Sequence, residues 1–427
     1  MNEAVFLLHC EYRLLHKLDR RAIIWRIMIG MYDLIIYFRN TILGTFYRLI
    51  TKPIFFLQDP ENVHDRMLRF GAFLGRHTLT RAVTRLFFDY RNKSLEQNIL
   101  GINFKNPVGL AAGFDKDACL TDILPSVGFG FAEVGSITGR PCEGNPKPRL
   151  WRLKKSQSLV VNYGLKNEGC EKISARLRTK KFEIPVGVSV AKTNCKETAE
   201  TGCGIDDYAV AFSSVADIAS FITINISCPN AFGGEPFTSA ERLEKLLARL
   251  DGVPMTRPVF LKLPADIESS SVDATLDIIS RHRVHGFVIC NLTKKRDNPM
   301  ILDSNVPVMG SISGPVMRER SNELISYVYG KVGKKYVIIG TGGIFTAEDA
   351  YEKILRGASL VQLITGMIYQ GPQVISEINR GLVRLLNRDG YRTIGSAIGT
   401  KIDEDMALLR ASSKSFVFWD NNKDNAY

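Results

Sequence analysis

Six polar side chains of the sequence stand directly after short apolar segments. They are two lysines, three asparagines and a cysteine: Lys116, Lys262, Asn225, Asn230, Asn291 and Cys228. A lysine in such a position can neutralise an anionic cofactor or a substrate carboxylate. Asparagines offer paired donors and acceptors, which match a ring rich in amide groups. Among these side chains, the thiol of Cys228 is the one suited to removing a proton.

Two glycine-rich turns add the possibility of phosphate binding. GTGG at 340–343 and ITG at 364–366 each follow an apolar segment. After the last strands of a parallel barrel, such turns expose backbone N–H groups that bind phosphate. Taken alone, the GTGG turn is also consistent with a simple tight corner.

The elements that must position these groups are eight apolar segments. They are residues 107–111, 131–134, 185–190, 221–224, 259–261, 286–289, 336–339 and 359–363. Amphipathic stretches lie between them at 240–250, 272–281, 318–329, 347–355 and 372–386. This alternation predicts an α/β fold, a closed parallel (β/α)₈ TIM barrel, whose functional residues follow the C-terminal ends of the strands. A doubly wound open sheet is the alternative, but no GxGxxG follows the first strand.

The first ninety residues differ in character from the barrel segments. Residues 1–93 hold 15 Lys or Arg against 8 Asp or Glu, and the most apolar stretch, 22–38, is interrupted by Arg26 and Asp33. A spanning helix needs about 20 mostly apolar residues, so an amphipathic helix lying on the membrane surface fits better, with a true span as the alternative. We expect an N-terminal helical extension over 1–93, the barrel over 94–400 and a C-terminal tail over 401–427.

Composition narrows the class of protein. The 427 residues are 45% hydrophobic and 23% charged, which excludes a disordered or fibrous chain. The eight cysteines lack CxxC pairs and zinc-type spacing, so we expect a reduced compartment and no structural metal. The net charge of +12 suits an anionic membrane surface or an anionic substrate. Nucleic acid is not an expected partner, because no basic stripe interleaves with the strand-end motifs.

Five motifs give the sequence a resemblance to a known family. They are NPVGLAAGFDK at 106–116, GFGFAEVGSIT at 128–138, GNPKPRLWRL at 144–153, NISCPN at 225–230 and GASLVQL at 357–363. The chain resembles, from about residue 45 to 399, the dihydroorotate dehydrogenases, FMN enzymes that oxidise dihydroorotate to orotate in pyrimidine synthesis. Segment 47–68 is similar to the membrane-associating extension of the quinone-reducing class 2 enzymes. The resemblance implies a peripheral membrane protein, on the cytoplasmic face of a bacterial cell membrane or on the mitochondrial inner membrane of a eukaryote.

The resemblance also implies roles for particular residues. The expected FMN-binding positions are Ala112, Gly113, Lys116, Ser136, Ser189, Asn225, Lys262, Cys290, Gly314, Gly343 and Thr365. The expected substrate-binding positions are Lys116, Asn162, Gly164, Leu165, Asn225, Asn230 and Asn291. Cys228 falls on the position of the catalytic base.

Several residues depart from the class 2 pattern. Cys228 stands where those enzymes have a serine and class 1 enzymes have a cysteine. Ser189 replaces an asparagine, Cys290 a threonine and Ile364 a tyrosine, and we expect Cys290 to be inert packing. Two kinds of alternative therefore stay open: a related flavin barrel that acts on another pyrimidine or reduces fumarate, and a catalytically silent, membrane-bound flavoprotein.

Overall fold

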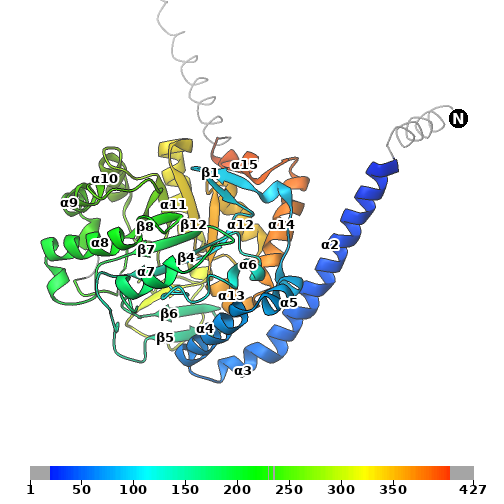
Figure 1. The fold of residues 1–427 in the computed structure, drawn as a ribbon, viewed down its shortest axis with the longest axis horizontal. Coiled ribbons are helices and arrows are strands. Elements are labelled where there is room, and N and C mark those ends of the chain that lie inside the picture. Colours follow the sequence, from blue (N-terminus) through cyan, green and yellow to red (C-terminus); the bar gives the residue numbers. More distant parts are fainter. Residues whose placement is uncertain (1–19, 229, 234–235, 404–427) are drawn as a thin grey trace, which may run out of the picture.

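The centre of the protein is a closed barrel of eight parallel strands. The computed structural model describes residues 20–228, 230–233 and 236–403. In chain order the barrel strands are β3 (Val108–Leu110), β4 (Phe131–Ile137), β7 (Val186–Val190), β8 (Phe221–Asn225), β9 (Val259–Leu263), β10 (Gly286–Ile289), β12 (Val337–Thr341) and β13 (Leu360–Leu363). Each coincides with one of the eight predicted apolar segments, and β13 pairs with β3 to close the ring (Figure 1). The predicted TIM barrel is confirmed.

Aromatic side chains fill the N-terminal end of the barrel. Phe131, Phe221 and Phe260 pack there against Phe104, which comes from a hairpin formed by β1 (Gln97–Ile99) and β2 (Ile102–Phe104). A Cβ on Gly187 would lie 2.2 Å from the ring of Phe221, so glycine is needed there to make room for the ring. The hairpin and these rings seal one end, which leaves the opposite end for the functional residues.

Helices surround the barrel. They are α6 (Leu124–Val127), α7 (Cys170–Arg178), α8 (Thr201–Val215), α9 (Ala240–Asp251), α10 (Ser269–Ile279), α11 (Arg318–Val332), α12 (Ala347–Leu355), α13 (Thr365–Gln370), α14 (Val374–Arg388) and α15 (Ile394–Ala397). Short 3₁₀ turns lie at Lys93–Leu95, Glu197–Ala199, Pro236–Thr238, Pro315–Met317 and Gly333–Lys335. The five predicted amphipathic stretches are α9, α10, α11, α12 and α14.

A small second sheet was not predicted from the sequence. The strands β5 (Leu150–Leu153), β6 (Ser158–Val161) and β11 (Ser311–Ser313) pair in antiparallel fashion in the order β11-β6-β5. Its strands come from two insertions more than 140 residues apart in the chain, so no local pattern could pair them. The sheet lies beside the residues that follow the barrel strands and covers part of that end.

The N-terminal extension is helical, as predicted, but it is less divided than expected. The predicted segments 22–38 and 46–57 belong to one continuous rod of α2 (Arg20–Phe46), a π-helical turn (Tyr47–Thr51) and α3 (Lys52–Phe56). Pro53 has no backbone N–H, and the wider π turn accommodates it without ending the rod. Among the helices described, none is both long and apolar enough to cross a membrane.

Two further helices complete the extension. Helix α4 (Pro60–Arg76) begins at Asp59, whose side chain accepts a hydrogen bond from the backbone N–H of Asn62 at 2.9 Å. Helix α5 (Thr78–Phe88) follows it. The helices end at Phe88 and the closing hairpin begins at Gln97, on either side of the predicted boundary. Residues 1–19 of the predicted extension and 404–427 of the predicted tail lie outside the described residues.

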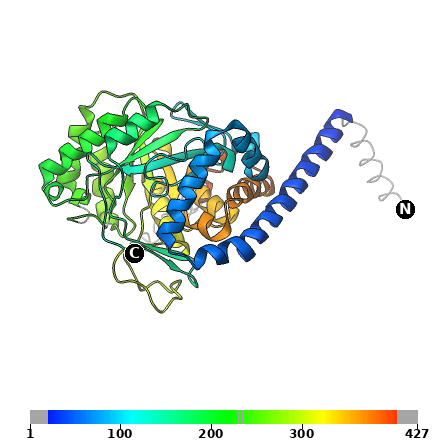
Figure 2. The same cartoon turned by 60° about the horizontal axis from the view of Figure 1, so that its bottom comes forward.

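Polar contacts attach α2 to the barrel helix α14. Asp33 forms an ion pair with Arg380 at 2.5 Å, and Arg39 donates to the backbone oxygen of Asp89 and to the hydroxyl of Ser376. In Figures 1 and 2, α2 runs beside α14 and then projects beyond the barrel. Asp33, which interrupts the apolar stretch of the sequence, therefore faces the protein.

Candidate active site

A large cavity opens at the C-terminal ends of the barrel strands. It brings together most of the residues predicted to form the site: Ala112, Gly113, Lys116, Ser136, Gly164, Leu165, Asn225, Cys228, Asn230, Lys262, Cys290, Asn291, Gly314, Gly343 and Thr365. They come from six barrel strands and from the loops that cover them. Parallel strands all end on one side of a barrel, which is why positions up to 250 residues apart converge.

Ser189 does not line the cavity but lies one layer behind it. Its hydroxyl is 2.7 Å from that of Ser136, and the side-chain amide of Asn225 donates to Ser136 at 2.8 Å. The side-chain oxygen of Asn225 accepts from the hydroxyl of Ser227 at 2.9 Å. Ser189 is therefore placed to act through Ser136, and the orientation of Asn225 is fixed at both of its polar atoms.

Asn162 also lies outside the cavity lining, in a network of asparagines. The amide nitrogen of Asn145 donates to the side-chain oxygen of Asn162 at 3.1 Å and to the backbone oxygen of Asn230 at 3.0 Å. The amide of Asn230 donates to the backbone oxygen of Val161 at 2.9 Å. Sequence reasoning did not single out Asn145, although it lies in the quoted motif at 144–153. These bonds fix Asn230 against the second sheet.

Two buried lysines make the cavity electropositive. The Lys116 ammonium lies 3.9 Å from the ring centroid of Tyr163 and is 8% exposed; Lys262 is 6% exposed. Burial, with a contribution from nearby Lys166, lowers the pKa of Lys116 to about 8. A buried ammonium group is costly unless an anion pairs with it. The cavity is therefore suited to an anionic ligand.

The glycine-rich turns form a close-fitting cradle on one side of the cavity. Gly342 and Gly343 have φ of +109° and +73°, and a Cβ on Gly343 would lie 2.6 Å from the Cα of Arg318. The hydroxyls of Ser313 and Thr365 are 2.8 Å apart at the same side of the cavity. Backbone without side chains next to paired hydroxyls is an arrangement that accepts a phosphate group.

The two cysteines of the cavity have different surroundings. Cys228 is half-buried, in the loop after β8. Cys290 is buried, and burial raises the pKa of its thiol to about 12. Cys290 therefore keeps its proton at neutral pH, which agrees with its expected role as packing.

The N-terminal extension supplies a cavity residue that the strand-end analysis missed. His64 of α4 lines the cavity, with its Nε2 2.9 Å from the backbone oxygen of Phe114. Burial and the charge of Lys116 lower the pKa of His64. The signal available in the sequence was its position within segment 47–68.

The same end of the cavity is apolar. Leu150, Leu159, Phe345, Ile364 and Ile368 line it. A buried cluster that includes Leu159, Phe345 and Ile368 continues to Phe56 of α3. An apolar path therefore leads from the strand ends toward the N-terminal helices.

Comparison with known proteins identifies the family. The model of the dihydroorotate dehydrogenase family matches residues 94–386. The dihydroorotate dehydrogenase (quinone) of Gloeobacter violaceus is 36% identical over 354 residues, covering 83% of this chain and 98% of that protein. That of Haloarcula marismortui is 38% identical over 312 residues, covering 73% and 87%. The solved structure of DHODH from Eimeria tenella in complex with ferulenol superposes with a TM-score of 0.71 at 27% identity, covering 80% of this chain and 95% of that one. The chain belongs to the dihydroorotate dehydrogenase family.

Proposed function

We propose that the protein oxidises dihydroorotate to orotate in pyrimidine biosynthesis, with FMN as its cofactor and a membrane quinone as its electron acceptor. Membership of the family supports the reaction and the flavin. The names of the relatives from Gloeobacter violaceus and Haloarcula marismortui support the quinone. The observation that carries the proposal is the convergence of Lys116, Asn225, Cys228 and Lys262 on one cavity.

The residues of the cavity fit FMN. The cradle of Gly314, Gly342, Gly343 and Thr365 accepts the phosphate, and a Cβ on Gly314 would lie 2.6 Å from the hydroxyl of Ser158. Lys262 lies beside Asn225 in the register of β8 with β9 and supplies positive charge for an electron-rich ring. Bound FMN supplies the two-electron acceptor for the hydride that leaves the substrate.

The substrate is a pyrimidine ring that carries two carbonyls, ring N–H groups and a carboxylate. Asn225, Asn230 and Asn291 offer the donors and acceptors that hold such a ring, and Lys116 offers a cation for the carboxylate. The thiolate of Cys228 removes the proton from the ring carbon beside the amide carbonyl, while hydride leaves from the neighbouring carbon. The second sheet and the Cys228 loop cover the ring, which limits access of water.

The test is an anaerobic titration of the purified holoenzyme. We expect a flavin absorption spectrum that bleaches when dihydroorotate is added, because the substrate passes two electrons to the flavin. A flavin-loaded protein whose spectrum does not change would contradict the proposal and favour the silent flavoprotein. A protein purified without flavin that does not bind added FMN would contradict the assignment of the cradle.

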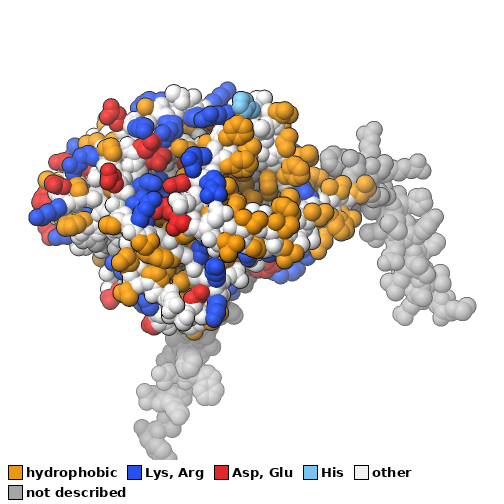
Figure 3. Space-filling view, turned by 90° about the horizontal axis from the view of Figure 1, so that it is seen from below, with side chains coloured by type: hydrophobic (Ala, Val, Ile, Leu, Met, Phe, Trp, Pro, Cys, Tyr) orange, Lys and Arg blue, Asp and Glu red, His pale blue; other side chains and the backbone are white. Residues whose placement is uncertain are grey.

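We propose that the N-terminal helices attach the protein to the membrane surface. Large apolar side chains are exposed along them: Met31, Leu34, Ile35, Phe38, Ile42, Phe46, Leu49, Ile50, Ile54, Leu57, Phe70, Phe73, Leu79, Val83, Leu86 and Phe87. They belong to a broad hydrophobic patch on the face seen in Figure 3. Monomeric soluble proteins rarely expose patches larger than a few hundred Å². Attachment through this patch would bring a quinone to the apolar end of the cavity, near Phe56.

Charged substitutions on this patch are expected to detach the protein from membranes. Leu57 is 87% and Leu86 72% exposed, so aspartate at both positions leaves the fold intact. Burying a leucine side chain contributes about 1.5–3 kcal/mol. We expect the double variant L57D/L86D to bind vesicles of phosphatidylcholine and phosphatidylglycerol at least about 100-fold more weakly, measured by co-sedimentation. It should reduce vesicle-embedded quinone slowly and a water-soluble dye at the normal rate.

The matched control is Val210→Asp, because Val210 is an exposed apolar residue of barrel helix α8. It should bind vesicles as the unsubstituted protein does. Equal vesicle binding by L57D/L86D would contradict attachment through the N-terminal helices. In a bacterium the attachment site would be the cytoplasmic face of the cell membrane, and in a eukaryote the mitochondrial inner membrane.

A further inference from the structure

A buried lysine behind the site connects two loops. Lys192 follows β7 by two residues and is 3% exposed. Its ammonium group donates a hydrogen bond of 2.8 Å to the backbone oxygen of Phe232. Phe232 belongs to the loop after β8, the same loop that carries Cys228. Lys192 therefore ties the end of β7 to the loop of the proposed base.

Lys192 and Cys228 also share a small cavity behind the main one. Tyr208 and Asn225 line it as well. The hydroxyl of Tyr208 donates to the backbone oxygen of Asn225 at 2.8 Å, and burial, followed by the charge of Cys228, raises the pKa of this phenol. Tyr208 therefore stays neutral, and Lys192 is the positive group on this side of Cys228. On the main-cavity side, the titratable lining groups are His64, Lys116, Tyr163, Lys166, Lys262 and Cys290.

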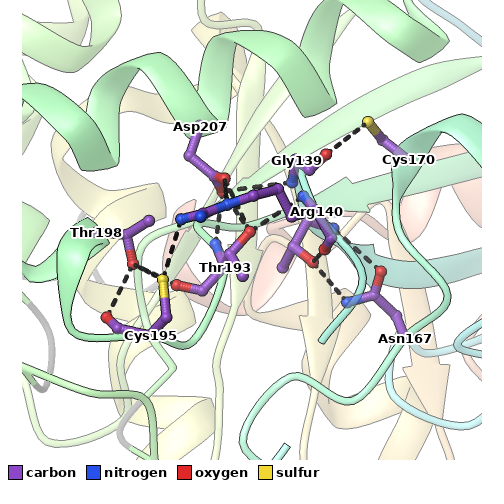
Figure 4. Close-up of polar contacts among 9 residues, drawn as sticks. Gly139, Arg140, Asn167, Cys170, Thr193, Cys195, Thr198 and Asp207 are labelled. Carbon is purple, nitrogen blue, oxygen red and sulfur yellow. Dashed lines mark hydrogen bonds and ion pairs between the residues drawn. The ribbon is translucent and has the colours of Figure 1, made fainter. Parts of the chain in front are cut away.

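The acidic groups near Lys192 are engaged by other partners. Asp207 of α8 accepts from the backbone N–H of Thr193 at 2.6 Å and from its hydroxyl at 2.8 Å (Figure 4). The sulfur of Cys195 accepts from the guanidinium of Arg140 at 3.1 Å (Figure 4). The thiol of Cys142, the remaining titratable neighbour, donates to the backbone oxygen of Gly164 at 3.5 Å.

The charge of Lys192 is thus incompletely neutralised. Its hydrogen bond goes to a neutral carbonyl, although the ammonium is buried. Burial lowers its pKa, whereas negative charge on Cys195, Cys228, Asp207 or Cys142 raises it. By reciprocity, a positive charge at Lys192 favours the ionised form of a thiol nearby.

We propose that Lys192 is a positioning residue for the base, which holds the Cys228 loop through Phe232 and stabilises the thiolate of Cys228 by its positive charge. The inference rests on the proposed role of Cys228 as the base. The thiolate takes the proton from the ring carbon and becomes a thiol, while hydride leaves the neighbouring carbon for FMN. The thiol then returns its proton to solvent before the next turnover, and Lys192 keeps its own proton throughout.

Three substitutions separate the charge from the hydrogen bond. Lys192→Gln keeps a donor for Phe232 without the charge, Lys192→Arg keeps both, and Lys192→Met removes both. Lys196→Met is the matched control, because Lys196 is an exposed lysine of the same loop. Two quantities are measured on each holoenzyme across pH 6–10. They are the rate of flavin reduction by dihydroorotate, and the rate at which iodoacetamide alkylates Cys228, followed by peptide mass mapping.

We expect K192Q and K192M to shift both pH profiles upward by about one unit or more, since loss of a nearby opposite charge has this effect. Flavin reduction at pH 7 should fall about tenfold and recover at high pH. K192R should restore most of the low-pH rate, and K196M should match the unsubstituted protein. If K192M does not accumulate as holoenzyme, K192Q carries the test.

Unchanged profiles for K192Q would overturn the electrostatic role, even if orotate bound more weakly. A Cys228→Ala variant that reduced its flavin normally would instead overturn the base itself. The alkylation profile separates these cases, because it reports ionisation of Cys228 whether or not that thiol takes part in the reaction.

Discussion

Replacing Cys228 with alanine is expected to lower the rate of flavin reduction by dihydroorotate by about 10²–10⁴-fold, the usual contribution of a general base. A free thiol has a pKa of about 8.5, so a few per cent is thiolate at neutral pH and can accept the proton directly. Orotate binding and flavin content should persist, because Lys116, Asn225 and the glycine-rich cradle are untouched. Anaerobic stopped-flow absorbance of the flavin measures the rate, and orotate titration measures the affinity.

Two further variants make this result specific. Cys228→Ser should recover part of the loss, because a hydroxyl is a much weaker acid and needs a proton relay to act. Cys203→Ala is the control, because Cys203 is exposed on α8. If C228A reduced its flavin at the normal rate, the thiol would be packing and the base would have to be another group of the cavity.

Replacing Glu61 with glutamine is expected to destabilise the fold by about 3–5 kcal/mol, the cost of breaking a buried ion pair. Glu61 of α4 is buried and lies 2.8 Å from the guanidinium of buried Arg149. Lys147 and Lys166 lie 3.6 and 3.7 Å from the same carboxylate. The substitution leaves these cations without their counter-ion and loosens α4 from the loop before β5. Urea unfolding followed by circular dichroism and flavin fluorescence measures the change.

The same carboxylate predicts a pH dependence. Burial acts to raise the pKa of Glu61, but Arg149, Lys147 and Lys166 together lower it below its ordinary value of 4.5. Its contribution to stability is therefore present above pH 4.5 and lost as the pH falls through the lower folded-state pKa. The unsubstituted protein should lose more stability in this acid range than E61Q does. Glu241→Gln, in an exposed pair with Lys245, should cost less than about 1 kcal/mol. Equal stability losses in E61Q and E241Q would contradict the role of the buried pair.

The barrel could be predicted from the sequence because its signals are local. A strand of a parallel barrel is covered on both faces, so β7 (VGVSV) and β10 (GFVI) are nearly unbroken apolar runs. The strand ends then fix which residues face the cavity, which is why Lys262 and Asn225 could be named from sequence. The resemblance of the motifs to a family added roles that spacing alone does not assign.

Features made by distant parts of the chain were beyond this reasoning. The second sheet pairs β6 with β11 across about 150 residues, and no local pattern encodes that pairing. The continuity of α2 with α3 depends on a π turn that relieves Pro53, whereas the proline alone suggested a break. Asp33 looked like a charge within a membrane-facing helix until its ion pair with Arg380 became visible.

The sequence by itself determined the strands, the end of the barrel that carries the chemistry and the residue types available there, because alternating burial and strand order are written locally. The tertiary structure alone decided the order of contact at the site. It set Ser189 behind Ser136, drew Asn162 into a network around Asn145, and brought His64 and Lys192 next to groups they do not neighbour in sequence. Contacts of this kind depend on loop closure and packing over the whole chain, and a pattern along one segment carries no information about them.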